Sequence, residues 1–246
     1  KMMTTAGSLA LDGARVQRDA NLVSRLREGG AIILAKTNLS EWANFRSTKS
    51  CTGWSSRGGQ VRNAYAIDRT PGGSSSGSAV AVARSFCAGA IGTETDGSIV
   101  VPAAMNSLVG IKPTVGMVSR AGVIPISFSQ DTAGPIAKTV TDASTILSVL
   151  MGHDPADSSS KDLKQGLARK FTQGFNRNAL KGKRIGVVRN YSGFQGAVDD
   201  IFDEALYLMK KCLQIVMDTG YQQKILDIKI IITLLFWGIA SHLETV

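Results

Sequence analysis

The chain has 246 residues, 43% of them hydrophobic, with 26 glycines and a formal net charge of +9. It can bury a substantial core as one large domain or two small ones, and its many glycines and few aromatic residues favour a loop-rich α/β protein over a helical bundle. Three widely separated cysteines and two histidines argue against a disulfide framework, a zinc site and a Ser-His-Asp triad, and no run of about 18 apolar residues, as a membrane-spanning helix needs, occurs.

The first predicted elements are a helix and a strand. Asp19 can serve as the N-cap of a helix that Gly29 and Gly30 end. The apolar run AIILA (31–35) then predicts a buried strand. Residues 47–71 are rich in Gly, Ser, Arg and Asn, which predicts a loop.

From residue 76 onward, predicted strands and helices alternate. The elements are a helix of small residues (76–90), short strands at GAIGTE and at 107–113, a helix capped by Thr139 or Thr141 that ends near Met151, a strand at 184–190 and a helix at 197–211. Because this alternation is typical of parallel sheets between helices, we predict an α/β fold with a mixed, mostly parallel β-sheet core covered by helices on both faces.

The positive charge is concentrated in residues 153–184. This segment holds eight lysine and arginine residues against three aspartates. It shows no helix-turn-helix, zinc-finger or RRM pattern. A solvated linker and an RNA-facing patch are the two interpretations, and the linker is favoured.

Two serine-containing motifs carry the candidate chemistry, PGGSSSGSA (71–79) and GTETDGSIVVPAA (92–104). Glycines let the backbone approach a substrate closely, and a turn with several N–H groups pointing one way can hold the oxyanion of acyl transfer. Each motif alone is also typical of a structural turn, and neither fits a P-loop or a G-x-S-x-G nucleophile elbow. Together and in this order they are far more specific.

The run from Gly72 to Ala143 resembles the core of the amidase-signature family. The matching pieces are GGSSSGSA, GTETDGSI, PAA and GIKPTVGMVSRAGVIPISFSQDTAGPIAKTVTDAS, and DANLVSRLREGGAIILAKTNLSEWANF is similar to the family's approach to that core. The resemblance covers residues 4 to about 210, and GTETDGSIV with SEWANFRS is most similar to the peptide amidase branch.

The resemblance implies one partial amidase domain over residues 1–246. The serine motifs lie at 71–104 and the basic linker at about 153–184. The segment at about 212–246 is atypical of the family. Its apolar run IIITLLFWGIA predicts either a buried strand or helix or a sequence artefact.

The resemblance also implies a Ser-cisSer-Lys triad. Ser98 matches the nucleophile that forms the acyl-enzyme. Ser74 matches the serine that follows a cis peptide bond and relays a proton, with its hydroxyl in hydrogen-bond reach of Ser98. The backbone amides of Thr95, Asp96, Gly97 and Ser98 would form the oxyanion hole, although many members carry glycine at the position of Asp96.

The third member of the triad is a lysine, which must be buried and neutral to accept a proton. In the family it lies in a Gly-x-Pro-x-x-x-Lys-Asp stretch, and residues 1–246 contain no such stretch. Lys36 matches a different family position, so it is not the expected base. We expect the catalytic lysine upstream of Lys1 and the 246 residues alone to be inactive.

Val100 and Asp131 are the substrate-binding residues that the resemblance implies. In relatives that act on carboxylate-bearing amides, an arginine two places after the nucleophile binds the acid. Val100 occupies that position here. We therefore expect an apolar or neutral acyl side, as in peptide or aryl amides.

Three functions are compatible with these motifs. The first is an amidase, a hydrolase of linear carboxamides. The second is the amidase subunit of a tRNA-dependent amidotransferase, which shares the serine motifs and would account for a basic surface. The third is a non-catalytic remnant, since the base is missing. The sequence segments SEWANFRS and TETDGSIV favour the first function, an amidase.

The expected partner is a small-molecule or peptide amide substrate. No cofactor, metal, nucleic acid or membrane is expected, and the sequence leaves the oligomeric state open. The first residues, KMMTTAGSLALDGARVQ, lack the basic-then-apolar order of a secretion signal, which favours a cytoplasmic location.

Overall fold

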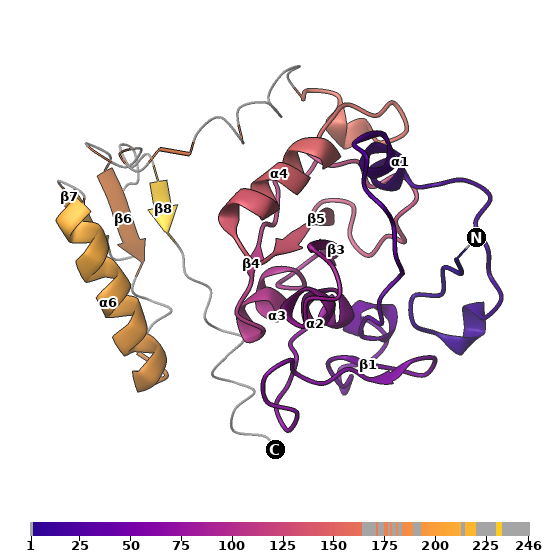
Figure 1. Cartoon of the computed structure of the whole chain (residues 1–246), viewed down its shortest axis with the longest axis horizontal. Coiled ribbons are helices and arrows are strands. Elements are labelled where there is room, and N and C mark those ends of the chain that lie inside the picture. Colours follow the sequence, from indigo (N-terminus) through magenta and orange to yellow (C-terminus); the bar gives the residue numbers. More distant parts are fainter. Residues whose placement is uncertain are drawn as a thin grey trace. The chain divides into compact units, whose positions relative to one another are not determined.

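A computed structural model gives the structure of the chain (Figure 1). It describes residues 2–163 and, beyond these, residues 171, 175–176, 178, 181, 184–188, 193–212, 215–219 and 230–232. The chain divides into two compact units, residues 1–173 and 174–246, and the boundary falls inside the basic segment. Most of residues 164–183, and most of the atypical segment at 212–246, lie outside the described residues, so the prediction of one partial amidase domain stays a prediction.

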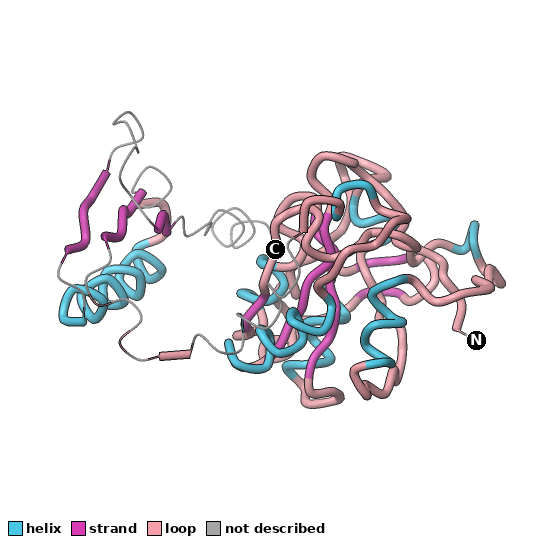
Figure 2. The backbone as a smooth tube through the Cα atoms, turned by 90° about the horizontal axis from the view of Figure 1, so that it is seen from above, coloured by secondary structure: helices cyan, strands magenta, loops and turns pink. Residues whose placement is uncertain are grey.

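The first unit contains short helices and strands joined by long loops, drawn in pink in Figure 2. Its elements are η1 (Leu9–Leu11), α1 (Asn21–Glu28), η2 (Glu41–Asn44), β1 (Trp54–Ser55), β2 (Gly59–Gln60), α2 (Ser76–Ala83), β3 (Gly89–Glu94), α3 (Val100–Met105), β4 (Val109–Gly110), β5 (Thr132–Ala137), α4 (Val140–Leu150) and η3 (Ser158–Ser160). The predicted helix at 76–90, the strand at GAIGTE and the loop at 47–71 are all present, although α2 ends at Ala83 and the loop contains the two-residue strands β1 and β2.

Helices cover both faces of the sheet β3-β5-β4, as predicted. Successive residues of a strand point to opposite faces. Ala133 of β5 packs against Leu147 and Leu150 of α4, while Ile136 of the same strand packs against Ala79 of α2 and against α3. In Figure 1, α4 accordingly lies above the strands, and α2 and α3 lie below them.

The strand directions in this unit differ from the mostly parallel sheet that we predicted. β3 and β4 both pair antiparallel with β5. They therefore run parallel to each other, as expected for two strands joined by helix α3. Between β4 and β5, residues 111–131 form no helix. This long loop lets β5 enter between its neighbours in the opposite direction, so the sheet is mixed.

The ends of two helices test the predicted caps. α4 begins as predicted, because the Thr139 side chain accepts a hydrogen bond from the Asp142 N–H at 3.1 Å. α1 ends at Gly29 as predicted, and Gly30 follows with φ +84°. The predicted N-cap of α1 is wrong: Ala20 holds that position, and the Asp19 carboxylate pairs instead with Arg27 at 2.9 Å.

The apolar run at 31–35 does not form the predicted buried strand. The Ile32 and Leu34 side chains are 84% and 65% exposed, and within residues 2–163 no strand pairs with this run. An apolar run indicates a preference for burial, but a strand also needs a neighbour for its backbone N–H and C=O groups. The sequence pattern indicates the preference for burial, but it does not show whether a neighbouring strand is present.

The second unit combines a parallel sheet with one long helix. Its described elements are β6 (Arg184–Val188), α6 (Gly196–Cys212), β7 (Ile215–Thr219) and β8 (Ile230–Ile232), and β6 pairs in parallel with both β7 and β8. Val187 of β6 packs against Phe202 and Leu206 of α6. The predicted helix at 197–211 is confirmed, and so is the strand at 184–188, while residues 189–190 of the predicted strand lie outside the described residues. The parallel pairing expected for the fold is found here.

Candidate active site

The two serine motifs meet at the beginnings of α2 and α3. Ser74 lies two residues before α2, and Ser98 lies in the turn between β3 and α3. The Ser75 N–H donates to the carbonyl oxygen of Ser98 at 3.2 Å. The Ser75 hydroxyl donates to the Thr93 carbonyl and accepts from the Thr93 N–H, both at 3.1 Å. Ser75 therefore joins the two motifs. The sequence predicts Ser75 as a helix-capping residue; it holds the N-cap position of α2, but its side chain bonds Thr93 and makes no capping hydrogen bond.

The glycines before Ser74 allow close backbone contact. A Cβ atom on Gly72 would stand 2.8 Å from the Pro102 Cα atom, and Gly72 has φ +67°. A Cβ atom on Gly73 would stand 2.6 Å from the Ser40 hydroxyl. A side chain at Gly72 would push the two motifs apart, and one at Gly73 would collide with Ser40, which explains why both residues are glycine.

The peptide bond between Gly73 and Ser74 is cis, as predicted. The Ser74 carbonyl accepts a hydrogen bond from the Ser40 N–H at 3.0 Å. The Ser74 hydroxyl is buried and has no hydrogen-bond partner among the described residues. The predicted hydrogen bond to the Ser98 hydroxyl is therefore not formed in this structure.

The turn before α3 presents free backbone N–H groups. Gly97 has φ +76°, which lets the chain turn sharply into the helix. Within the part of the chain that the structure describes, the N–H groups of Asp96, Gly97 and Ser98 donate to no protein acceptor. Three successive free N–H groups suit an oxyanion. The geometry is compatible with the predicted hole, and the role of Thr95 and these residues stays a prediction.

Glu94 fixes the backbone directly after Ser98. It is the last residue of β3 and only 5% exposed. One oxygen of its carboxylate accepts from the N–H groups of Ile99 at 2.7 Å and Val100 at 3.0 Å. Negative charge at a helix N-terminus is favourable. Sequence reasoning missed Glu94, because its partners are backbone N–H groups, which leave no local pattern in the sequence.

Asp131 holds a loop against the same turn. One carboxylate oxygen accepts from the Thr95 hydroxyl at 2.6 Å, and the other accepts from the N–H groups of Ile126 and Ser127 at 2.8 and 2.9 Å. Asp131 therefore has a positioning role in this structure. Its predicted contact with substrate, like that of the half-buried Val100, stays a prediction.

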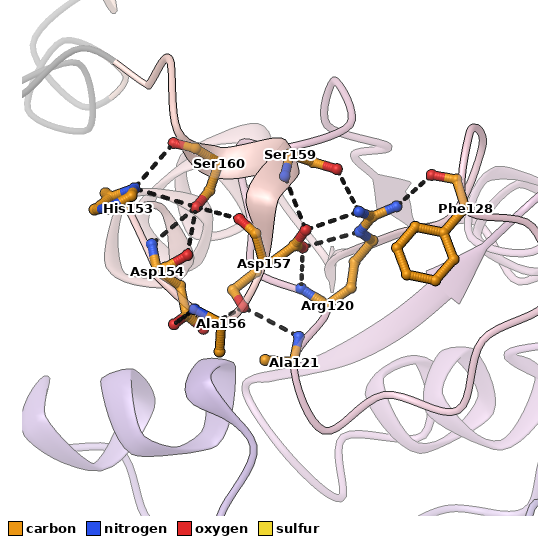
Figure 3. A network of polar contacts seen from close by, with 10 residues as sticks. Arg120, Ala121, Phe128, His153, Asp154, Ala156, Asp157, Ser159 and Ser160 are labelled. Carbon is orange, nitrogen blue, oxygen red and sulfur yellow. Dashed lines mark hydrogen bonds and ion pairs between the residues drawn. The ribbon is translucent and has the colours of Figure 1, made fainter.

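A buried ion pair anchors the other side of this loop (Figure 3). The Arg120 guanidinium donates to both carboxylate oxygens of Asp157, at 2.9 and 2.7 Å, and to the Phe128 carbonyl at 2.5 Å. It also bonds the Ser159 hydroxyl and lies 5.1 Å from the centre of the Phe128 ring. The hydrogen bonds from Arg120 hold the pKa of the Asp157 carboxyl well below its usual range. The pair therefore stays charged at neutral pH.

No lysine or histidine among the described residues bonds the hydroxyl of Ser74 or Ser98. Lys36 donates to the Thr4 hydroxyl instead. Partial burial lowers the Lys36 pKa, while the charge of Asp19 opposes that shift. The described residues also contain no group of three or more His, Cys, Asp or Glu side chains that could hold a metal ion. None of the described helices is long and apolar enough to cross a membrane.

Residues 1–236 match the family model described as Amidase. The chain belongs to the amidase family. It is 52% identical over 193 residues to a probable amidase of Arabidopsis thaliana, covering 78% of this chain and 38% of the relative. Native peptide amidase of Stenotrophomonas maltophilia is 50% identical with a TM-score of 0.83, covering 89% of this chain and 45% of that chain.

A third similar protein is a glutamyl-tRNA(Gln) amidotransferase subunit of Syntrophobacter fumaroxidans. It is 40% identical over 218 residues, covering 89% of this chain and 43% of the relative. This amidase chain thus spans less than half the length of the relatives that it matches. The predicted family and the α/β amidase fold are confirmed, and the likeness to peptide amidase agrees with the predicted branch.

Proposed function

We propose that this chain carries the acyl-transfer centre of an amidase that hydrolyses linear carboxamides through an acyl-enzyme on Ser98. One observation supports the proposal: the turn with free N–H groups at residues 96–98 is hydrogen-bonded, through the Ser98 carbonyl and the Ser75 N–H, to the motif that holds the buried, unpartnered Ser74 hydroxyl. Membership of the amidase family gives the reaction class, a hydrolase acting on C–N bonds.

In the proposed reaction, the Ser98 hydroxyl oxygen bonds to the substrate carbonyl carbon while its proton passes to Ser74. The Ser74 proton moves in turn to the neutral lysine that the family resemblance implies. The N–H groups of residues 96–98 donate to the oxyanion that forms. The proton then returns through Ser74 to the leaving nitrogen as the C–N bond breaks, and water cleaves the ester by the same route.

The lysine is the part of this mechanism that residues 1–246 do not supply. They contain no Gly-x-Pro-x-x-x-Lys-Asp stretch, and Lys36 bonds Thr4. The test protein is therefore this chain extended upstream through such a segment, called the extended protein below. The neutral Val100 supports substrates with an apolar acyl side, such as peptide or aryl amides.

Covalent labelling tests the nucleophile. A sulfonyl fluoride or phosphonofluoridate should modify the extended protein at Ser98, because the paired serines and the base activate that hydroxyl. Peptide mapping by mass spectrometry locates the label, and Ser98→Ala should abolish it. Ser129→Ala, an exposed serine outside the motifs, is the matched control and should label normally. A label on another residue that survives Ser98→Ala would contradict the assignment.

The amidotransferase subunit is the second candidate. Its support is the 40% identity to a subunit of a glutamyl-tRNA(Gln) amidotransferase and the net charge of +9. Co-purification of the extended protein with partner subunits and tRNA would favour it. Ligand binding without turnover by the extended protein would favour the third function, a non-catalytic remnant.

A further inference from the structure

The loop at 126–131 is bonded to the nucleophile's turn through Thr95. The Thr95 hydroxyl, three residues before Ser98, donates to the Asp131 carboxylate at 2.6 Å. The other oxygen of that carboxylate accepts from the N–H groups of Ile126 and Ser127, at 2.8 and 2.9 Å. The proposed mechanism gives the Thr95 hydroxyl no role, yet it is the contact through which this loop can fix the turn.

Apolar burial contributes little to the position of the loop at 126–131. The Ile126 and Phe128 side chains are 36% and 77% exposed, and Ser129 and Gln130 are exposed as well. Burial stabilises a side chain roughly in proportion to the apolar area that it removes from water. The position of this loop therefore depends on its polar contacts.

Arg120 supplies such a polar contact, as Figure 3 shows. Its Nε and Nη2 atoms donate to the two carboxylate oxygens of Asp157, and its Nη1 atom donates to the Phe128 carbonyl at 2.5 Å. The Asp157 carboxylate is itself fixed by the backbone N–H groups of Arg120 and Ser159, at 2.8 and 3.1 Å. Because a guanidinium is planar and its donors have fixed directions, the paired bonds to Asp157 point Nη1 at the loop.

We infer that Arg120 is a positioning residue that fixes the turn of Ser98 through the loop at 126–131. This inference rests on the proposed function. The proposed transition state needs the Ser98 oxygen and the free N–H groups of residues 96–98 in fixed relative positions, and a misplacement of about 1 Å can cost about 10²-fold in rate. Loss of an interaction that matters only in the transition state lowers kcat and leaves KM nearly unchanged. Arg120 should therefore affect kcat without touching the substrate.

Arg120→Lys removes the connection to the loop and keeps a charge opposite Asp157. Lysine has one nitrogen on a flexible stem, so it cannot bond both carboxylate oxygens and the Phe128 carbonyl in the same geometry. In the extended protein, kcat for ammonia release from a neutral peptide amide should fall by about 10-fold or more, with KM changed by less than about 2-fold. Asp19→Asn, which removes the exposed ion pair with Arg27, is the matched control and should leave both constants unchanged.

Thr95→Val and Thr95→Ser test the other end of the connection. Valine has the shape of threonine without the hydroxyl, so it should lower kcat about as much as Arg120→Lys does, whereas serine keeps the hydroxyl and should retain most of the activity. Thermal unfolding checks that each variant is folded.

The double variant Arg120→Lys/Thr95→Val separates positioning from a general loss of stability. If Arg120 acts through Thr95, the double variant should have a kcat within about 2-fold of the slower single variant, because substitutions in one connected network are not additive. A merely structural Arg120 would lower kcat by the same factor whether or not the Thr95 hydroxyl is present.

Three results would overturn the inference: an unchanged kcat in Arg120→Lys, an unchanged kcat in Thr95→Val, or single-variant factors that multiply in the double variant. The comparison of Thr95→Val with Thr95→Ser leaves the ion pair intact, so the inference can fail even where Arg120→Lys does not fold. Failure of the proposed function is distinguishable. It would appear as no Ser98-dependent hydrolysis by the unsubstituted extended protein, and it would overturn the inference as well.

Discussion

At the scale of residues, the carboxylate of Glu94 is the contact that holds the nucleophile's turn. It accepts from two N–H groups directly after Ser98 and is itself buried. One carboxylate oxygen of Glu94 thus holds both the end of the turn, through the Ile99 N–H, and the start of α3, through the Val100 N–H. The position of Ser98 should depend on a residue that takes no part in bond breaking.

Glu94→Ala should lower kcat in the extended protein with a smaller change in KM. The substitution leaves the Ile99 and Val100 N–H groups without their acceptor, which costs about 1–3 kcal/mol for each buried group left unsatisfied. Glu94→Gln keeps an acceptor oxygen and should retain most of the activity. Steady-state kinetics and thermal unfolding of both variants check this. Equal kinetics for the two variants would show that the acceptor does not position Ser98.

The cis bond before Ser74 could be predicted from the sequence, because Ser74 and Ser98 lie in two short motifs that resemble the amidase family. The catalytic roles of both serines stay predictions. The positioning role of Glu94 could not be predicted from a sequence motif. Glu94 acts through backbone N–H groups that any residue can supply.

At the scale of elements, the ion pair between Arg120 and Asp157 ties the loop at 126–131 to the turn at η3. Asp131 then ties the same loop to Thr95. The two side chains of the pair are only 10% and 4% exposed, so solvent screens them weakly. Breaking the pair should affect both stability and the shape of the site.

Asp157→Asn should lower the free energy of unfolding by about 3–5 kcal/mol at neutral pH, because it leaves the buried Arg120 charge unpaired. Since the folded-state pKa of Asp157 is depressed, its stabilisation is present above the unfolded pKa, near 4, and is lost as pH falls through the folded value. Urea unfolding across this pH range should show that the difference in the free energy of unfolding between wild type and variant becomes smaller in acid. A difference in the free energy of unfolding that is absent, or that does not change with pH, would contradict the stabilising role of the ion pair.

Elements with their own capping and packing signals were predicted well, as α4 with its Thr139 cap shows. The run at 31–35 was predicted wrongly, because strand formation depends on a partner elsewhere in the fold. The strand β5 was not predicted at all, and with it the antiparallel pairing of this sheet was missed. β5 lies between β3 and β4 and pairs antiparallel with both, and this pairing depends on segments that are distant in the sequence.

At the scale of the whole molecule, the chain matches the amidase family over residues 1–236 yet spans 45% of native peptide amidase. It supplies both predicted serines and the turn of free N–H groups. The proposed base belongs to a sequence stretch that residues 1–246 do not contain. We therefore expect amide hydrolysis to depend on Ser98 together with that additional lysine segment.

Ammonia release from a neutral peptide amide tests this claim most directly, measured side by side for the 246-residue chain, the extended protein and its Ser98→Ala variant. We expect turnover by the extended protein alone, with the other two slower by at least about 10²–10⁴-fold, the contribution of a positioned base. If the 246-residue chain hydrolyses the amide as fast as the extended protein, the base lies within residues 1–246. If Ser98→Ala retains full activity, Ser98 is not the nucleophile.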